Sequence, residues 1–428
     1  RMKKILLFIF ALSVFQFAQA QQTPAPEQSG AIMVVGATAH IGNGTVIENS
    51  AIGFDKGKIT FIGKASEANQ AGHKVIDAKG KHVYPGLIGG NTSLGLVEIE
   101  AVRSTRDNAE VGAFNPSIRS VIAYNTDSRV TPTVRSNGVL MVQVVPSGGW
   151  ISGQSSIVEL DGWNWEDASY KTDDGIWMAW PQPYARSGWW AEPGGVSANK
   201  KYQEQIRTLK DFFKDAKSYI DGEPKVKNLK FEAMRGLFDG SKQLFIKTNY
   251  VKAIMSAVEM AEEFGVKYVI VGGQDAWQMT DYLKKHNTRI MLSKTQRLPN
   301  RDHEDVDQAF KTPVALQKAG IEYCIMFNDA WQVRNLPFQA GQAVPFGLSK
   351  EEALSSVSLN VAKILGIDKT VGSLEKGKDA TLVVSNGDIL DPLTNQVTHA
   401  FIQGKAIDLD NKQKKLYRKF KAKYAEEK

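Results

Sequence analysis

Cysteine is almost absent from this chain of 428 residues, and the single cysteine, Cys324, cannot form a disulfide within the chain. Stability must therefore come from an apolar core, which a composition of 42% hydrophobic and 23% charged residues can supply. Long hydrophobic runs are scarce too. The apolar run Ile5 to Phe15, interrupted only by Ser13, is far shorter than the roughly 20 residues that cross a bilayer. We therefore expect no transmembrane segment in the mature chain.

The amino-terminal residues instead have the three parts of an export signal. Met2-Lys3-Lys4 is basic, the short apolar run follows it, and Ala18-Gln19-Ala20 is a small-x-small cleavage site. We expect residues 2–20 to be a signal peptide, cleaved after Ala20, and the mature protein to be periplasmic or secreted. Residues 21–30 have the composition of a polar, proline-containing linker.

An excess of charge of one sign is confined to one segment. The net charge is +7, but residues 411–428 alone carry eight Lys or Arg and two Glu. The charge distribution therefore does not support a general nucleic-acid-binding surface. Within this segment, Leu416, Phe420 and Tyr424 recur at helical spacing and predict a short basic amphipathic helix. We consider two roles for it, contact with a membrane surface or partner and a loosely docked terminal helix.

Strand-like segments broken by glycine occur at both ends of the chain, and a different pattern lies between them. There, apolar runs such as QLFIKT, KYVIVGG and EYCIMF alternate with helix-period stretches such as YVKAIMSAVEMAEEFG. This repetition predicts a parallel barrel or a doubly wound sheet over residues 85–372. We expect residues 31–84 and 373–410 to meet in one composite β-domain.

Tryptophan is concentrated in one segment. Seven of the nine tryptophans fall between Trp150 and Trp190, which we interpret as an insertion in the α/β region over residues 150–190. The rings could line a ligand platform or a partner interface. The other interpretation is that they form the core of the inserted segment, because tryptophans are heavily buried on average.

Several motifs together carry a family resemblance. VYPGLI ends the first β-segment, SLNVAKILGI lies on a late helix, and GSLEKGKDATLVV, DILDP and AFIQGKAIDL follow it. This set resembles the amidohydrolase superfamily, and more narrowly its imidazolonepropionase-related branch, from about Ala31 to Leu409. The resemblance implies a TIM-like (β/α)8 barrel with a composite β-sandwich built from both chain ends. It also implies hydrolysis of non-peptide carbon–nitrogen bonds assisted by zinc or another divalent metal.

The resemblance places the metal ligands at barrel strand ends, where this chain has other residues. The family pattern is Asp-x-His-x-His on the first strand, one histidine on each of the fifth and sixth strands, and an aspartate on the eighth. The corresponding residues here, in chain order, are Gly89, Asn91, Ser93, Lys247, Gly272 and Asp329. A shift of one residue would put Asn328 in the last position. Because amide and hydroxyl side chains are poor ligands for a transition metal, we expect no metal cofactor.

The six histidines of the chain do not fill these positions. They are His40, His73, His82, His286, His303 and His399. The lysine at the fifth strand end has three interpretations: a catalytic amine, a paired structural charge, or an ammonium beside Asp329 that partly replaces the charge of the missing metal. Asp329 and Lys247 are the candidate catalytic residues that remain.

Two main functional hypotheses follow. The first is an exported, catalytically degenerate amidohydrolase that keeps the fold and acts as a binding or assembly subunit, with a small-molecule ligand in its pocket. The second is an active hydrolase of carbon–nitrogen bonds with a different site around Asp329, Asp275 and Lys247. A third joins them, in which the chain forms a homo-oligomer or associates with an active relative. Fold resemblance supports all of these, because function depends on the site.

Overall fold

The computed structural model describes residues 23–189, 191–222, 225–299, 301 and 304–426. The predicted signal peptide, residues 2–20, lies outside these residues. No helix in the described part of the chain is both long enough and apolar enough to cross a membrane.

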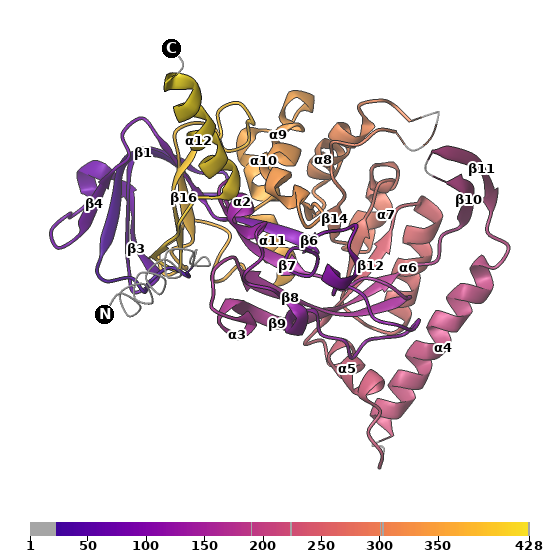
Figure 1. Cartoon of the computed structure of the whole chain (residues 1–428). Helices are drawn as coiled ribbons and strands as arrows, with labels where there is room; N and C mark the ends of the chain where they lie inside the picture. The colour runs from indigo at the N-terminus through magenta and orange to yellow at the C-terminus, as the bar shows by residue number, and fades with distance from the viewer. Residues whose placement is uncertain (1–22, 190, 223–224, 300, 302–303, 427–428) are drawn as a thin grey trace, which may run out of the picture.

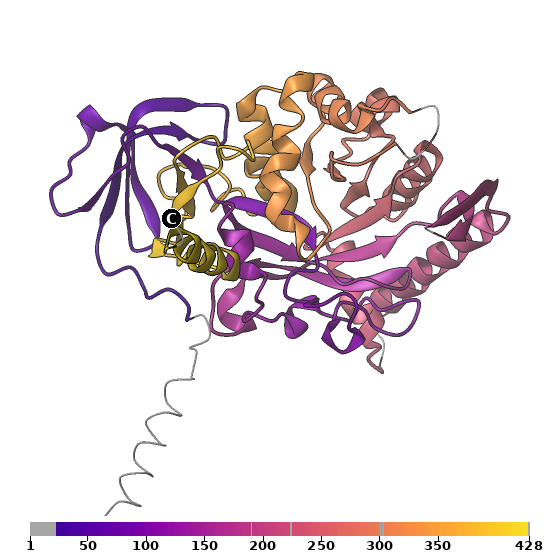
Figure 2. The ribbon, with the colours of Figure 1, turned by 45° about the horizontal axis from the view of Figure 1, so that its top comes forward.

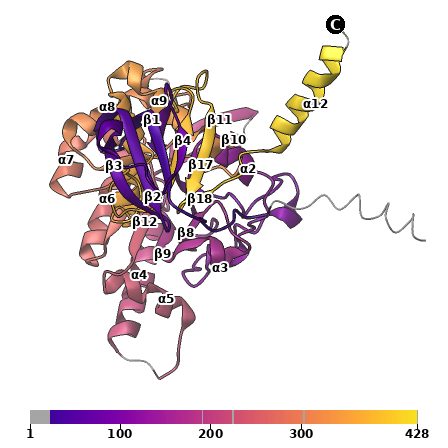
Figure 3. The ribbon, with the colours of Figure 1, turned by 90° about the vertical axis from the view of Figure 1, so that its left-hand side faces the viewer.

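Both ends of the chain contribute to one eight-stranded sheet, which Figure 1 shows on the left and Figure 3 face-on. Its amino-terminal strands are β1 (Ile32–His40), β2 (Val46–Asp55), β3 (Lys58–Lys64), β4 (Lys74–Asp77) and β5 (His82–Pro85), and its carboxyl-terminal strands are β16 (Leu382–Ser385), β17 (Val397–Ile402) and β18 (Lys405–Ala406). Strand β16 pairs antiparallel with β5, with Val383 opposite Tyr84. Buried Phe54 and Phe401, one from each end of the chain, meet edge to face with ring centroids 5.0 Å apart. This core makes the sheet domain composite.

A second eight-stranded sheet forms the barrel. Its strands are β6 (Leu87–Thr92), β7 (Val139–Val144), β8 (Ile151–Glu159), β9 (Ser169–Ala179), β12 (Gln243–Thr248), β13 (Tyr268–Gly272), β14 (Ile290–Leu292) and β15 (Tyr323–Ile325), paired in this sequence. Strands β9 and β12 to β15 pair in parallel, as do β6 and β7. Strand β8 is antiparallel to both of its neighbours. The fold is therefore a TIM-like barrel in which one strand is reversed.

Helices and one hairpin surround this sheet (Figures 1 and 2). The helices are α2 (Thr131–Arg135), α3 (Trp165–Ala168), α4 (Tyr202–Asp221), α5 (Leu229–Phe238), α6 (Val251–Glu263), α7 (Thr280–Lys285), α8 (Gln308–Ala319), α9 (Leu336–Gly341), α10 (Lys350–Ser356) and α11 (Leu359–Leu365), and the hairpin pairs β10 (Tyr184–Trp189) with β11 (Glu192–Ala198). Local sequence explains where α10 begins and where α8 ends. Ser349 and Glu352 form a capping box at the start of α10, and Gly320 ends α8 in a left-handed conformation.

The tryptophan-rich segment corrects one prediction. Residues 150–190 are not an insertion, because they supply strands β8 and β9 of the barrel. Trp177 and Trp180 are fully buried, whereas Trp163 and Trp189 are 69% and 57% exposed. The segment therefore contributes both to the core and to the surface. The spacing of apolar residues does not reveal these strands, because β8 is buried along its whole length and lacks the alternating pattern of a half-buried strand.

The basic tail forms helix α12 (Lys412–Glu426). The chain is held to α2 at the start of this helix, where Thr133 donates to Gln413 at 3.0 Å and Asn411 donates to Ser136 at 3.2 Å. Figure 3 shows the rest of the helix projecting from the body. Its apolar side chains, including Phe420 at 47% exposure, remain in contact with solvent.

Candidate functional site

A cavity of about 340 Å³ lies at the carboxyl ends of the barrel strands. Loops that follow parallel strands converge at this end of a barrel, where functional residues are generally held. Three of the six predicted ligand positions, Asn91, Lys247 and Gly272, line the cavity. Gly89, Ser93 and Asp329 do not line it. We call this cavity the barrel mouth.

Strand register places Lys247 in the barrel mouth. In the parallel ladders it lies opposite Ala179 of β9 and Val271 of β13, which line the same cavity. Two residues earlier on β12, Phe245 stacks on Trp177 with ring centroids 4.9 Å apart and planes 10° from parallel. Since residues i and i+2 of a strand face the same side, the lysine lies one layer above this aromatic pair.

The ammonium of Lys247 has unusual electrostatics. It forms no hydrogen bond or ion pair with any of the described residues, so the predicted pairing with Asp329 is not found. The side chain reaches solvent through the mouth, yet desolvation by the surrounding barrel walls lowers the pKa of its amine below the ordinary value. A larger fraction of this amine is therefore neutral, and nucleophilic, than for a surface lysine.

Two further cations line the barrel mouth, and sequence reasoning missed both. Lys294 lies with its ammonium 5.4 Å from the centroid of the Phe327 ring, and Arg297 donates to Glu304 at 3.4 Å. They lie in the loop that follows strand β14, so their position after a parallel strand was the available signal.

Neutral polar groups make up much of the remaining wall. Asn91, Gln182, Asn249, Gln274 and Asn328 contribute side-chain amides. No histidine or carboxylate occurs among the described residues that line the cavity. The barrel mouth is therefore positively charged and rich in hydrogen-bonding groups.

Two polar atoms beside the barrel mouth are buried without a partner in the described structure. They are the hydroxyl oxygen of Thr248, whose residue is 2% exposed, and the amide oxygen of Asn249. An unsatisfied buried polar group costs roughly 1–3 kcal/mol. A ligand or bound water that reached these atoms would recover part of that cost.

The backbone at two predicted ligand positions differs from ordinary strand geometry. Asn91 has a φ of 52°, at an irregularity in the pairing of β6 with β7, and its amide donates to the sulfur of Met326 at 3.2 Å. Gly272 has a φ of 102°, and a Cβ there would lie 2.5 Å from the Asn249 side-chain oxygen and 2.9 Å from the Thr248 carbonyl oxygen. A histidine at position 272 therefore does not fit this backbone.

At the end of the eighth strand, the structure shows which of Asn328 and Asp329 faces the cavity. Asn328 lines the barrel mouth, whereas the carboxylate of Asp329 accepts backbone N–H groups of Trp331 and Gln332. Asp329 therefore caps the turn that follows the strand. This short-range role explains why a carboxylate occurs there without facing the cavity.

The residues present do not fit a divalent metal. Among the described residues no group of three or more His, Cys, Asp or Glu side chains is arranged to hold a metal ion. At Gly89 a Cβ would lie 2.9 Å from Val333, so a larger residue needs a rearrangement there. Amides and ammonium groups in the barrel mouth supply neither the thiolate and imidazole donors nor the negative charge that such ions prefer.

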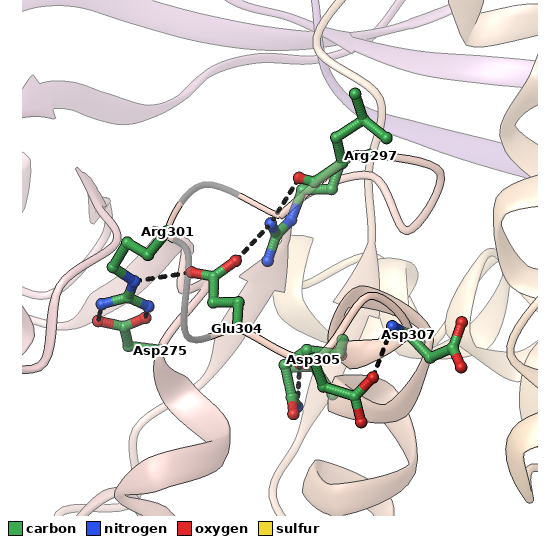
Figure 4. A network of polar contacts seen from close by, with 9 residues as sticks. Asp275, Arg297, Arg301, Glu304, Asp305 and Asp307 are labelled. Atoms are coloured by element: carbon green, nitrogen blue, oxygen red, sulfur yellow. Dashed lines mark hydrogen bonds and ion pairs between the residues drawn. The ribbon is translucent and has the colours of Figure 1, made fainter. Parts of the chain in front are cut away.

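Asp275, the third residue of the second hypothesis, belongs to a different contact network (Figure 4). The residue is 3% exposed, and its carboxylate receives two hydrogen bonds from the guanidinium of Arg301, one of them at 3.1 Å. Arg301 also donates to Glu304 at 2.8 Å, and Glu304 receives the bond from Arg297. This chain of ion pairs borders the barrel mouth and holds Asp275 outside its lining. Asp275, Asp329 and Lys247 therefore do not form one site.

A second buried acid, Asp174, was also missed. Gln143 donates to its carboxylate at 2.8 Å and Ser155 at 2.6 Å, so β7, β8 and β9 each contribute one member of this cluster. Burial raises the pKa of Asp174 to about 6. None of the three lines the barrel mouth, and no local sequence motif links them.

Comparison with known proteins finds sequence similarity over part of the chain. Residues 247–407 match the Amidohydrolase family. An amidohydrolase, tasK, of Hapsidospora irregularis is 27% identical over 143 residues, and the imidazolonepropionase of Bacillus thuringiensis is 52% identical over 50 residues. These alignments cover 28% and 11% of this chain. They span only 14% and 12% of the lengths of those two relatives.

Solved structures extend the likeness over most of the chain. A crystal structure of an amidohydrolase from Thermotoga maritima has a TM-score of 0.76 and 21% identity, covering 88% of this chain and 99% of that one. An adenosine deaminase from Xanthomonas campestris with bound zinc has a TM-score of 0.51 and 14% identity, covering 90% and 96%. At these identities the structures show a shared fold. Residues 247–407 thus resemble the Amidohydrolase family in sequence, and most of the chain shares its fold with these solved structures.

Proposed function

We propose that this chain is a catalytically degenerate amidohydrolase that binds a small anionic ligand in its barrel mouth and uses no metal. One observation carries the proposal: the mouth combines Lys247, Lys294 and Arg297 with side-chain amides, and its described lining has no histidine or carboxylate.

Electrostatics separate this role from that of a metal site. An unpaired ammonium within a partly desolvated cavity repels a divalent cation and attracts an anion. Ammonium and guanidinium groups form charge-assisted hydrogen bonds to carboxylates and phosphates, which are about twice as strong as neutral ones. Side-chain amides then fix the orientation of the bound molecule without adding charge. The same residues that weaken a metal site therefore favour an anion.

The alternative of an active hydrolase receives less support from the geometry. Its two carboxylates are held elsewhere, Asp275 by Arg301 and Asp329 by backbone N–H groups. Neither is placed beside Lys247 to activate a water molecule. Hydrolysis of carbon–nitrogen bonds thus stays the chemistry of the family, and binding is our proposal for this chain.

We also propose export and association. The amino-terminal sequence of residues 2–20 supports the first, and intact-mass measurement of natively expressed protein should find a chain that begins at Gln21. The exposed rings of Trp163 and Trp189 support the second. Light scattering of protein purified from its source should then show a homo-oligomer or a complex with a related chain, and a clean monomer would contradict association.

Metal analysis and an activity screen test the degenerate assignment. We expect well under one transition metal per purified chain, and no hydrolysis of acylated amino acids, dipeptides or cyclic amides above background. Activity that a chelator abolishes and zinc or manganese restores would overturn the proposal. Metal-independent hydrolysis lost in Lys247→Ala would favour the alternative.

A further inference from the structure

The barrel mouth contains an amine in the environment that favours covalent chemistry with a carbonyl group. Lys247 lies in a cavity above the stacked Phe245 and Trp177, between the small or apolar side chains of Ala179 and Val271. No described carboxylate pairs with it. A structural lysine normally has such a partner, which would keep it protonated.

We propose that Lys247 condenses with the carbonyl group of a small oxo acid, whose carboxylate is held by the other cations of the barrel mouth. The proposal rests on the anion-binding function proposed above, and it adds a covalent bond and a ligand class to that function. Desolvation supports it, because a lowered pKa increases the neutral fraction of the amine.

The reaction needs no additional oxidant, reductant or metal. The lone pair of the neutral Nζ attacks the carbonyl carbon, a carbon–nitrogen bond forms, and the carbonyl π electrons move to oxygen, which takes a proton to give a carbinolamine. The nitrogen then loses its second proton, the carbon–oxygen bond breaks, and the oxygen leaves as water. The product is an imine, and protonation of its nitrogen gives an iminium.

The positive charges of the barrel mouth indicate a carboxylate as the second functional group of the ligand. Lys294 forms no ion pair with a described residue, and Arg297 presents a guanidinium to the same cavity. A carboxylate next to the carbonyl would meet these cations while the carbonyl faces Lys247. The described lining offers no acid or base to move protons quickly, so we expect a stable, reversible adduct without rapid turnover.

Borohydride trapping tests the inference directly. The full chain is incubated with pyruvate and cyanoborohydride, which reduces an imine to a secondary amine. Intact mass should show one adduct per chain, with a mass gain equal to pyruvate less one oxygen atom. Peptide mapping should place the adduct on Lys247. Because the mapping uses the wild-type protein, it does not depend on the folding of any variant.

Matched reagents and variants test separately the carbonyl and carboxylate of the ligand and the two lysines of the barrel mouth. Lactate lacks the carbonyl and should give no adduct, and acetone lacks the carboxylate and should give at least tenfold less. Lys247→Arg retains a positive charge without a nucleophilic amine, so its adduct should disappear. Lys294→Met should raise the pyruvate concentration for half-maximal trapping at least tenfold.

Two kinds of failure are distinguishable. If calorimetry shows saturable binding of pyruvate and lactate but no adduct maps to Lys247, the covalent inference is wrong and the anion-binding function stands. An adduct spread over many surface lysines would also overturn the inference. If neither acid binds, the proposed function fails and the inference fails with it.

Discussion

Replacing Gly272 by alanine tests why a histidine cannot occupy the sixth strand end. The glycine has a φ of 102°, and an added Cβ would lie 2.5 Å from the side-chain oxygen of Asn249 and 2.9 Å from the carbonyl oxygen of Thr248. The unfavourable φ costs roughly 1–3 kcal/mol for a residue with a Cβ. Displacing the close neighbours adds about 1–3 kcal/mol. We therefore expect the variant to lose about 2–6 kcal/mol of unfolding free energy.

Gly265 offers a matched control for the part of this free-energy loss that comes from the positive φ. Its φ is 65°, but no atom lies within 4 Å of an added Cβ. Gly265→Ala should cost only about 1–2 kcal/mol. Urea unfolding of the two variants and the wild type at the same pH gives both values. A free-energy loss for Gly272→Ala no larger than that for Gly265→Ala would contradict the proposed steric clash at position 272.

Three other perturbations test the surroundings of the site. Burial, followed by the charge of Asp379, raises the pKa of Glu159 to about 8, so the folded chain holds a proton that the unfolded chain loses near pH 4.5. The stability that this group contributes should therefore fall as pH rises from about 5 to 8. In urea unfolding, Glu159→Gln should flatten that pH dependence, whereas Glu48→Gln, at an exposed position, should not. Trp177→Ala should cost about 3–5 kcal/mol, and a loss below 1 kcal/mol would contradict its place in the core under the mouth. Asp275→Asn should cost about 1–3 kcal/mol in the same assay, because it leaves the partly buried guanidinium of Arg301 with only one of its two carboxylates, that of Glu304. An unchanged midpoint would contradict the ion-pair network of Figure 4.

The fold was predictable from the sequence because its signals are local or repeated. Alternation of β12, α6, β13, α7 and β14 follows the spacing of apolar residues. The reversed direction of β8 was not predictable, because direction depends on which neighbours a strand meets and not on its own pattern. The continuous burial of β8, which removes any alternating pattern, explains why the sequence predicts an insertion around the buried Trp177 of β9.

Prediction of the site was partial for a related reason. The family resemblance places Asn91, Lys247 and Gly272 at strand ends, and all three line the cavity. The positions of Lys294 and Arg297 depend on the path of a loop, which periodicity does not specify. The role of Asp329 as a cap could be seen only from its short-range backbone bonds.

Calorimetric titration of chelator-treated protein with pyruvate tests the central claim most directly. We expect saturable binding that persists in the chelator and is at least tenfold weaker in Lys247→Met. Lys74→Met, which removes an exposed charge from β4, should keep the wild-type affinity. Absence of saturable binding, or binding that appears only after zinc is added, would contradict it.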